Sequence, residues 1–153
     1  NNDKSNMTII GGTRGLGKWF AEHLRNDFNI RITSRDESSG KPIADEIDVE
    51  YSNDNIEAIK DADIIIFSVP IEHMVETIRE VAPHAPEGSL LMDVTSVKTE
   101  PAEALEKYAP KKPTRIRQER SLTASEGSIR GYFSACAKRI EFIIDCAPSD
   151  FVI

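Results

Sequence analysis

The chain has only two cysteines and one tryptophan among its 153 residues. Cys136 and Cys146 both fall late in the sequence, which predicts neither a disulfide framework nor a metal site. No apolar run approaches the roughly 20 residues of a membrane-spanning helix. The first residues, N-N-D-K-S-N, lack the apolar core of a signal peptide. We therefore expect a cytoplasmic protein with reduced thiols and no membrane partner.

Basic residues are also scarce over most of the chain. The net charge is -7 at pH 7, whereas nonspecific nucleic-acid binding normally needs a basic face, so we expect no nucleic-acid partner. The charge is uneven, because residues 1–109 carry 11 basic and 21 acidic residues, while residues 110–153 carry 8 and 5. This change predicts a boundary near Pro110.

Strand and helix patterns alternate from residue 7 to residue 109. Apolar runs predict strands, and apolar residues at helical spacing predict the helices between them. The expected strands are 7–10, 29–33, 49–51, 64–69 and 90–94, and the expected helices are 16–24, 42–47, 56–60, 71–78 and 103–108. The order predicts an α/β fold with a doubly wound parallel sheet, a Rossmann-like domain. We expect a disordered tail over 1–6, this domain over 7–110 and an atypical tail over 111–153, where only 140–144 suggests a strand.

Four glycines mark the turn after the first expected strand, in I-I-G-G-T-R-G-L-G-K-W-F (residues 9–20). Free backbone N–H groups at a helix start attract a pyrophosphate, and glycine lets the backbone approach it. As G-x-G-x-x-G the stretch has Arg14 in place of the middle glycine. As G-x-x-x-G-x-G, Gly11, Gly15 and Gly17 match fully, a pattern that resembles the short-chain dehydrogenases. Its place between a strand and a helix predicts a dinucleotide site.

The end of the second strand predicts which cofactor is bound. An NAD site usually has an acidic residue there for the ribose hydroxyls, whereas this chain has T-S-R-D (residues 33–36). A hydroxyl at Ser34 and a guanidinium at Arg35 suit a ribose 2′-phosphate. Arg14 is placed to contact the same phosphate or to stack on adenine. We expect NADP and rank NAD second, because Asp36 lies only slightly out of register.

A short-chain dehydrogenase also needs a Tyr-x-x-x-Lys pair, whose lysine lowers the pKa of the tyrosine. Tyr108 and Lys112 have this spacing, but Pro110 between them disfavours the helix that would bring both onto one face. This match is therefore assigned to chance.

A-D-I-I-I-F-S-V-P (residues 62–70) and L-L-M-D-V-T-S-V-K (residues 90–98) point to another family. Together with the glycine turn and the run N-D-N-x-x-A-x-K-D-A-D, they resemble prephenate dehydrogenases of the archaeal type over residues 7 to about 109. The resemblance implies NADP-dependent oxidative decarboxylation of prephenate to 4-hydroxyphenylpyruvate in tyrosine biosynthesis, and a homodimer for the intact enzyme. It implies that Ser96 orients the substrate hydroxyl, although Ser96 also fits a helix N-cap.

The resemblance also implies a histidine in a T-H-P motif and a helical C-terminal domain, and neither is found in this sequence. The three histidines, His23, His73 and His84, all precede Ser96, and we expect His23 and His73 on the surface. Two hypotheses remain for 111–153: a divergent ending or translation from a shifted reading frame. The chain alone would then bind NADP weakly and turn over little.

The predicted cofactor-binding residues form three groups along the chain. They are Gly11, Gly12, Thr13, Arg14, Gly15, Leu16 and Gly17 in the turn, Ser34 and Arg35 after the second strand, and Ser68, Val69 and Pro70 after the fourth strand. Two alternatives stay open: another NADP oxidoreductase, such as a deazaflavin-dependent NADP reductase, or a non-catalytic nucleotide sensor. The sequence does not separate prephenate from arogenate.

Overall fold

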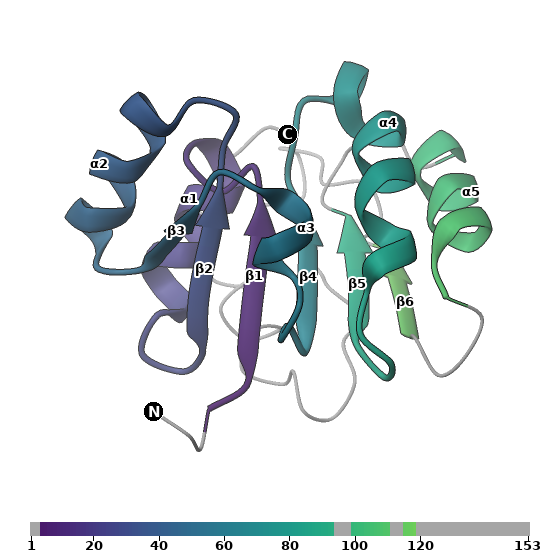
Figure 1. The fold of residues 1–153 in the computed structure, drawn as a ribbon, viewed down its shortest axis with the longest axis horizontal. Coiled ribbons are helices and arrows are strands. Elements are labelled where there is room, and N and C mark those ends of the chain that lie inside the picture. The colour runs from purple at the N-terminus through teal and green to yellow at the C-terminus, as the bar shows by residue number, and fades with distance from the viewer. Residues whose placement is uncertain (1–3, 94–98, 111–114, 119–153) are drawn as a thin grey trace, which may run out of the picture.

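The computed structural model describes residues 4–93, 99–110 and 115–118, which form a parallel sheet with helices on both faces (Figure 1). The strands are β1 (Asn6–Ile10), β2 (Asn29–Thr33), β3 (Glu50–Ser52), β4 (Ile64–Phe67), β5 (Leu90–Asp93) and β6 (Arg115–Gln118). The helices are α1 (Gly15–Leu24), α2 (Glu37–Ile47), α3 (Asn55–Ala58), α4 (Ile71–Val81) and α5 (Thr99–Tyr108), with a 3₁₀ turn η1 (Ala82–His84). The predicted doubly wound α/β fold is confirmed.

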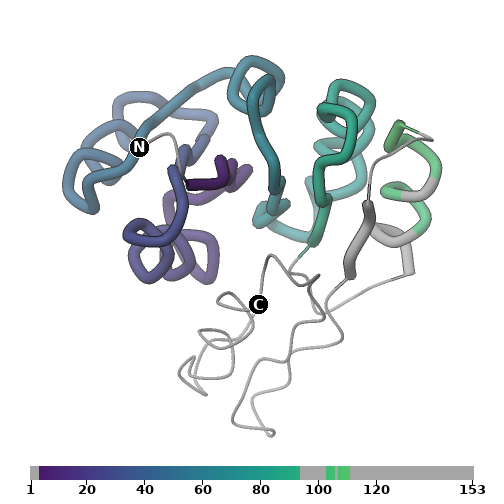
Figure 2. The backbone as a smooth tube through the Cα atoms, turned by 90° about the horizontal axis from the view of Figure 1, so that it is seen from below, coloured from purple at the N-terminus to yellow at the C-terminus, as the bar shows by residue number. Residues whose placement is uncertain are grey.

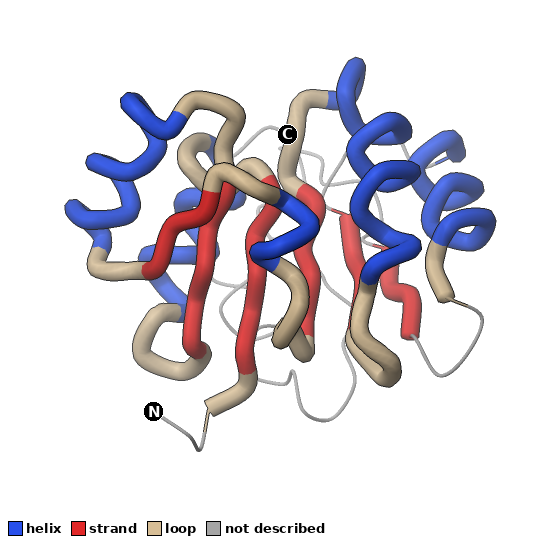
Figure 3. Tube along the Cα trace, viewed as in Figure 1, coloured by secondary structure: helices blue, strands red, loops and turns tan. Residues whose placement is uncertain are grey.

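The strand order of the sheet creates a crevice at one edge. The order is β3-β2-β1-β4-β5-β6, and every neighbouring pair is parallel. The direction in which the chain winds therefore reverses between β1 and β4, and ligands of such sheets bind outside the carboxyl ends of the strands at that reversal. In Figure 3 the loops that leave β1, β2 and β4 meet at this upper edge.

The two faces of the sheet bury separate apolar clusters. Residues Ile64 and Ile66 of β4 pack with α1 and α2, whereas Ile65 and Phe67 pack with α4 and α5. All four are buried, as the unbroken apolar run in this segment indicates. Figure 2 shows α1 and α4 on opposite sides of the sheet. These two cores fix the strand ends on which the site is built.

Helix α2 begins earlier than the sequence pattern suggested. We expected Pro42 in its first turn, but the helix starts at Glu37, and Pro42 lies inside it. The reason is Asp36, whose carboxylate Oδ1 accepts a hydrogen bond from the Ser38 backbone N–H at 3.0 Å and caps the helix there. Pro42 is exposed, so its missing N–H is tolerated on the solvent side of the helix.

The sheet is also longer at both ends of the chain than expected. β1 begins at Asn6, so this residue belongs to the sheet and not to a disordered tail; its backbone N–H bonds Asp63 Oδ2 at 2.8 Å. At the other end, β6 pairs in parallel with β5, in a segment where we expected no strand. The strand suggested at 140–144 lies outside the described residues. Within the part that the structure describes, no helix is long and apolar enough to cross a bilayer.

Candidate cofactor site

The glycine turn between β1 and α1 is tied to both neighbouring strand ends. The Gly11 N–H donates to Oγ1 of Thr33, the last residue of β2, at 3.1 Å. The Ser68 N–H, just beyond β4, donates to the Ile10 carbonyl at 2.8 Å. These bonds join β1, β2 and β4 at the carboxyl edge and hold the turn in place.

Three of the four glycines allow the protein to pack closely against itself. A Cβ on Gly11 would lie 2.7 Å from the Ser68 carbonyl oxygen, and a Cβ on Gly17 would lie 2.8 Å from Ser68 Oγ. A Cβ on Gly12 would lie 2.8 Å from Ile32 Cγ2. Such contacts are too short for any side chain, so these glycines bring α1 against β2 and the β4 end.

Gly15 serves a different purpose. Its φ is +59°, a left-handed conformation that favours glycine, and a Cβ there would meet no atom within 4 Å. Arg14, the N-cap residue of α1, makes no side-chain cap hydrogen bond, and the first turn holds no acidic residue. The N-terminus of α1 therefore faces open space with a favourable dipole, which is the arrangement that binds phosphate.

A cavity of about 400 Å³ opens at this place. Ten of the twelve predicted cofactor residues line it, while Gly12 and Gly17 lie behind the turn and serve its packing. The lining residues from the prediction are Gly11, Thr13, Arg14, Gly15, Leu16, Ser34, Arg35, Ser68, Val69 and Pro70. The structure thus brings the three predicted groups together around one cavity.

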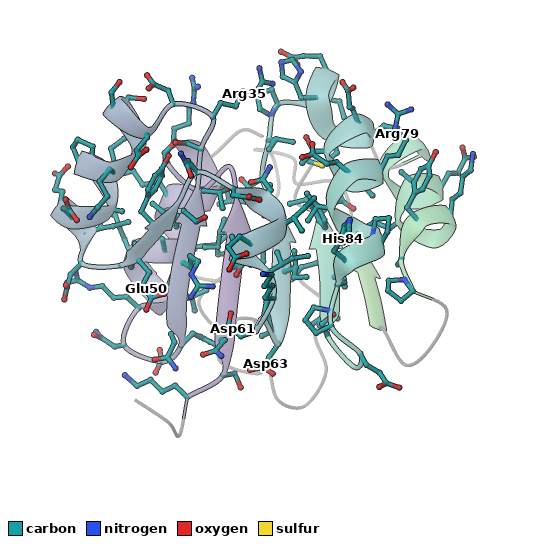
Figure 4. The ribbon with its side chains drawn as sticks, in the orientation of Figure 1. Arg35, Glu50, Asp61, Asp63, Arg79 and His84 are labelled. Carbon is teal, nitrogen blue, oxygen red and sulfur yellow. The ribbon has the colours of Figure 1, made fainter. Side chains whose placement is uncertain are left out.

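The β2 end supplies one wall of the cavity. Arg35 is exposed and lies above the carboxyl edge of the sheet (Figure 4). Asp36 is engaged in the α2 cap, where hydrogen bonds from the Ser38 hydroxyl and backbone N–H hold the pKa of its carboxyl below the ordinary value. The Arg35 guanidinium is thus the positive group on this wall. The neighbouring Asp36 carboxylate already accepts two hydrogen bonds from Ser38.

The cavity has seven further lining residues, and four of them lie outside the sequence stretches from which cofactor contacts were predicted: Ser39, Asn55, His73 and Thr77. His73 was expected on the surface, but it is half-buried and faces the cavity from α4. Thr77 follows one turn later, and its hydroxyl donates to the His73 carbonyl at 2.7 Å. The available signal was their i, i+4 spacing directly after the Val-Pro turn, which places both on one face of the helix.

A larger hollow, of about 580 Å³, lies at the opposite edge of the sheet. Its polar wall is a structural ion-pair network: Arg31 bonds Glu50 Oε2 at 2.8 Å and Asp61 Oδ1 at 3.0 Å. Burial acts to lower the pKa of Arg31, but these two carboxylates raise it above its ordinary value overall. Glu50 and Asp61 lie far below Arg35 in Figure 4, so this hollow is separate from the glycine turn.

Comparison with known proteins agrees with the geometry. The model of the prephenate dehydrogenase nucleotide-binding domain matches residues 20–116, and a probable arogenate/prephenate dehydrogenase of Methanocaldococcus jannaschii is 45% identical over 140 residues, 82% of this chain. The chain belongs to the prephenate dehydrogenase family. It covers only 31% of the length of the M. jannaschii protein. The T-protein of Haemophilus influenzae is 37% identical over 66% of this chain and 23% of its own length.

Solved structures share the fold of this prephenate dehydrogenase relative. A. aeolicus prephenate dehydrogenase, determined with hydroxyphenyl propionate and NAD+, superposes with a TM-score of 0.65 at 21% identity over 76% of this chain and 41% of its own. Synechocystis arogenate dehydrogenase gives 0.65 at 23% identity over 75% and 40%. The family match ends at residue 116, within β6.

The predicted catalytic residue of this family member, Ser96, lies outside the described residues. Asp93, which begins the D-V-T-S-V-K stretch, is described and is fully buried at the end of β5. It pairs in register with Phe67 of β4. The end of β5 therefore lies at the same carboxyl edge of the sheet as the glycine turn.

Proposed function

We propose that this chain is the NADP-binding part of an enzyme that oxidises prephenate. The observation that carries the proposal is the N-terminus of α1, which has no side-chain cap and opens into a cavity with Arg35 on its wall. A helix start of this kind suits a pyrophosphate, and a guanidinium two residues past β2 suits a 2′-phosphate. NADP is favoured over NAD because the Asp36 carboxylate is engaged at the start of α2.

Each group of residues has a part in this proposal. The backbone N–H groups around Gly15 hold the pyrophosphate, while Ser34 and Arg35 hold the 2′-phosphate. Arg14, exposed at the N-cap, reaches the same phosphate or the adenine ring. Ser68, Val69 and Pro70 border the nicotinamide ribose. The bound cofactor supplies the hydride acceptor.

The proposed reaction is an oxidative decarboxylation in tyrosine biosynthesis. Prephenate loses a hydride from its hydroxyl-bearing ring carbon to the cofactor while that hydroxyl gives up its proton. The ring carboxylate then leaves as carbon dioxide, its bonding electrons enter the ring, and the ring oxygen takes a proton back. The ring becomes aromatic, and the product is 4-hydroxyphenylpyruvate. Ser96 orients the hydroxyl that gives up its proton. The name of the M. jannaschii relative, which includes both arogenate and prephenate, supports a cyclohexadienol substrate of this class.

The test is calorimetric titration of the full chain with NADP and with NAD. We expect tighter binding of NADP, and Arg35→Ala should remove about ten-fold or more of this preference because a charge-assisted bond to phosphate is lost. The matched control is Arg79→Ala, which removes an exposed arginine of α4 that lies away from the cavity (Figure 4). An unchanged NADP-to-NAD ratio in Arg35→Ala would remove Arg35 from the site, and binding of neither cofactor would defeat the proposal.

A further inference from the structure

Behind Ser34 lies Tyr51, which is hydrogen-bonded to Ser34 but does not itself line the cavity. The Ser34 Oγ lies 2.7 Å from the Tyr51 Oη and 3.0 Å from the Asp36 carbonyl oxygen. Tyr51 sits on β3, is half-buried against the α1 and α2 core, and contacts Ser34 from the side away from the cofactor cavity. Ser34 thus stands between Tyr51 and the cavity.

The direction of these hydrogen bonds follows from the number of protons. Ser34 has one hydroxyl proton, and the Asp36 carbonyl can only accept, so Ser34 donates to Asp36. The Tyr51 hydroxyl has two acceptors within reach, Ser34 Oγ at 2.7 Å and the Ser34 carbonyl oxygen at 3.4 Å. The shorter contact is the better hydrogen bond, which assigns Tyr51 as the donor to Ser34 Oγ. A hydroxyl that accepts one hydrogen bond becomes a better donor in the next, because neighbouring bonds polarise one another. Tyr51 therefore strengthens Ser34 as a donor.

Gly40 leaves the space that this pair needs. A Cβ on Gly40 would lie 2.1 Å from Ser34 Oγ and 2.7 Å from Tyr51 Cε2. Glycine within a helix costs about 1 kcal/mol relative to alanine, and Gly40 lies within α2. Apart from proline, glycine is the residue that a helix tolerates least. α2 nevertheless has glycine at position 40, where any side chain would displace the Ser34–Tyr51 pair.

We infer that Tyr51 is a positioning residue for cofactor choice: it donates to Ser34 Oγ and so directs the Ser34 proton to the ribose 2′-phosphate. This inference rests on the proposed NADP site. When the 2′-phosphate arrives, the Ser34 hydroxyl exchanges the Asp36 carbonyl for a charged acceptor, while its bond from Tyr51 is kept. NAD carries a hydroxyl in place of this phosphate, and so gains little from the Tyr51 bond.

The test is a double-mutant cycle of Tyr51→Phe and Ser34→Ala, with calorimetric titration of NADP and NAD on the full chain. We expect Tyr51→Phe to weaken NADP binding about three- to ten-fold and to change NAD binding less than about two-fold. In the Ser34→Ala background, Tyr51→Phe should have no further effect on NADP binding, because the group through which it acts is gone. Tyr108→Phe, which removes a phenol hydroxyl on α5, is the matched control.

Other results would overturn the inference. Equal losses for both cofactors in Tyr51→Phe, or additive losses in the double variant, would show that Tyr51 only supports the fold. An unchanged NADP-to-NAD ratio in Tyr51→Phe, with the wild-type preference intact, would reject the role of Tyr51 and leave the NADP site standing. A wild-type chain that binds both cofactors equally would reject the NADP preference and the role of Tyr51 together.

Discussion

At the scale of single residues, the Asp36 carboxylate starts a helix and, under the proposed function, leaves cofactor choice to its neighbour Arg35. It accepts from the Ser38 N–H at 3.0 Å and the Ser38 hydroxyl at 2.7 Å. These bonds favour its charged form and lower its pKa in the folded chain. An acid used in this way has less capacity for ribose hydroxyls, so in the proposed function Arg35 decides which cofactor is preferred.

The lowered pKa of Asp36 predicts a pH-dependent contribution to stability. A depressed folded pKa stabilises the chain above the unfolded pKa, about 3.9, and this contribution is lost as the pH falls below it. We expect Asp36→Ala to lower the Tm at pH 7, with a difference from wild type that shrinks toward pH 3. Asp36→Asn keeps a capping side chain that does not titrate and serves as the control. Thermal unfolding followed by circular dichroism measures this, and a difference that is the same at both pH values would contradict the assignment.

The individual site residues divide into those that a sequence pattern can locate and those that it cannot. Arg35 and the glycines of the turn have fixed positions relative to a strand end, and the structure places Arg35, Gly11 and Gly15 on one cavity. His73 and Asn55 come from α4 and α3, and their convergence depends on the strand order. No local spacing in the sequence encodes that order.

At the scale of elements, the junction of β1 and α1 separates two uses of glycine. Gly15 has a positive φ and open space around it, so Gly15→Ala should cost about 1–2 kcal/mol of stability and place a methyl group where the pyrophosphate approaches. In Gly12→Ala the added Cβ would lie 2.8 Å from Ile32 Cγ2, and this overpacking should lower the free energy of unfolding by about 1–3 kcal/mol. We therefore expect Gly15→Ala to lose about ten-fold or more in affinity for both cofactors with a modest change in stability.

Urea unfolding and calorimetry on the two variants measure both effects. Gly12→Ala should show the larger loss of stability together with cofactor affinity close to wild type, provided that the titration is made where the variant is folded. If Gly15→Ala binds both cofactors as tightly as wild type, the pyrophosphate does not lie on this turn. Equal stability of Gly12→Ala and wild type would contradict the close packing of the turn on β2.

The elements themselves could be predicted where burial imposed a clear pattern. β4 is wholly apolar because helices cover both faces of the sheet, whereas β2 alternates between apolar and polar residues. The positions of β1, β2, β4 and β5 were predicted within one or two residues at each end. The start of α2 was misplaced because proline at a first turn is a strong signal, whereas the Asp36 cap that overrides it depends on one hydrogen bond. The strand β6, R-I-R-Q, has a single apolar residue, and it was found only through its pairing with β5.

At the scale of the whole molecule, the described residues build the nucleotide-binding domain of the family. The chain covers 31% of the M. jannaschii relative and 41% of the A. aeolicus structure, and the described cavity of about 400 Å³ is formed by the strand ends of the nucleotide-binding sheet. Sequence reasoning could predict this fold because the alternation of buried strands and helices runs through the whole of 7–109. A substrate pocket could not be predicted, because residues 111–153 show no sequence pattern that marks substrate-binding side chains.

We therefore expect this chain to bind the cofactor but to turn over little prephenate. NADP at about 100 times its Kd should stabilise the folded state by about 2.7 kcal/mol, which thermal unfolding measures as a rise in Tm. Hydride transfer needs more than a bound cofactor: it needs prephenate held in a dry pocket beside a group that takes the hydroxyl proton. The three histidines all precede Ser96, His23 and His84 are exposed, and His73 faces the cofactor cavity. We expect a clear NADP-dependent rise in Tm, with NADPH formation from prephenate near background. Rapid NADPH formation by the purified chain would contradict this and would show that residues beyond the described cavity complete a working active site.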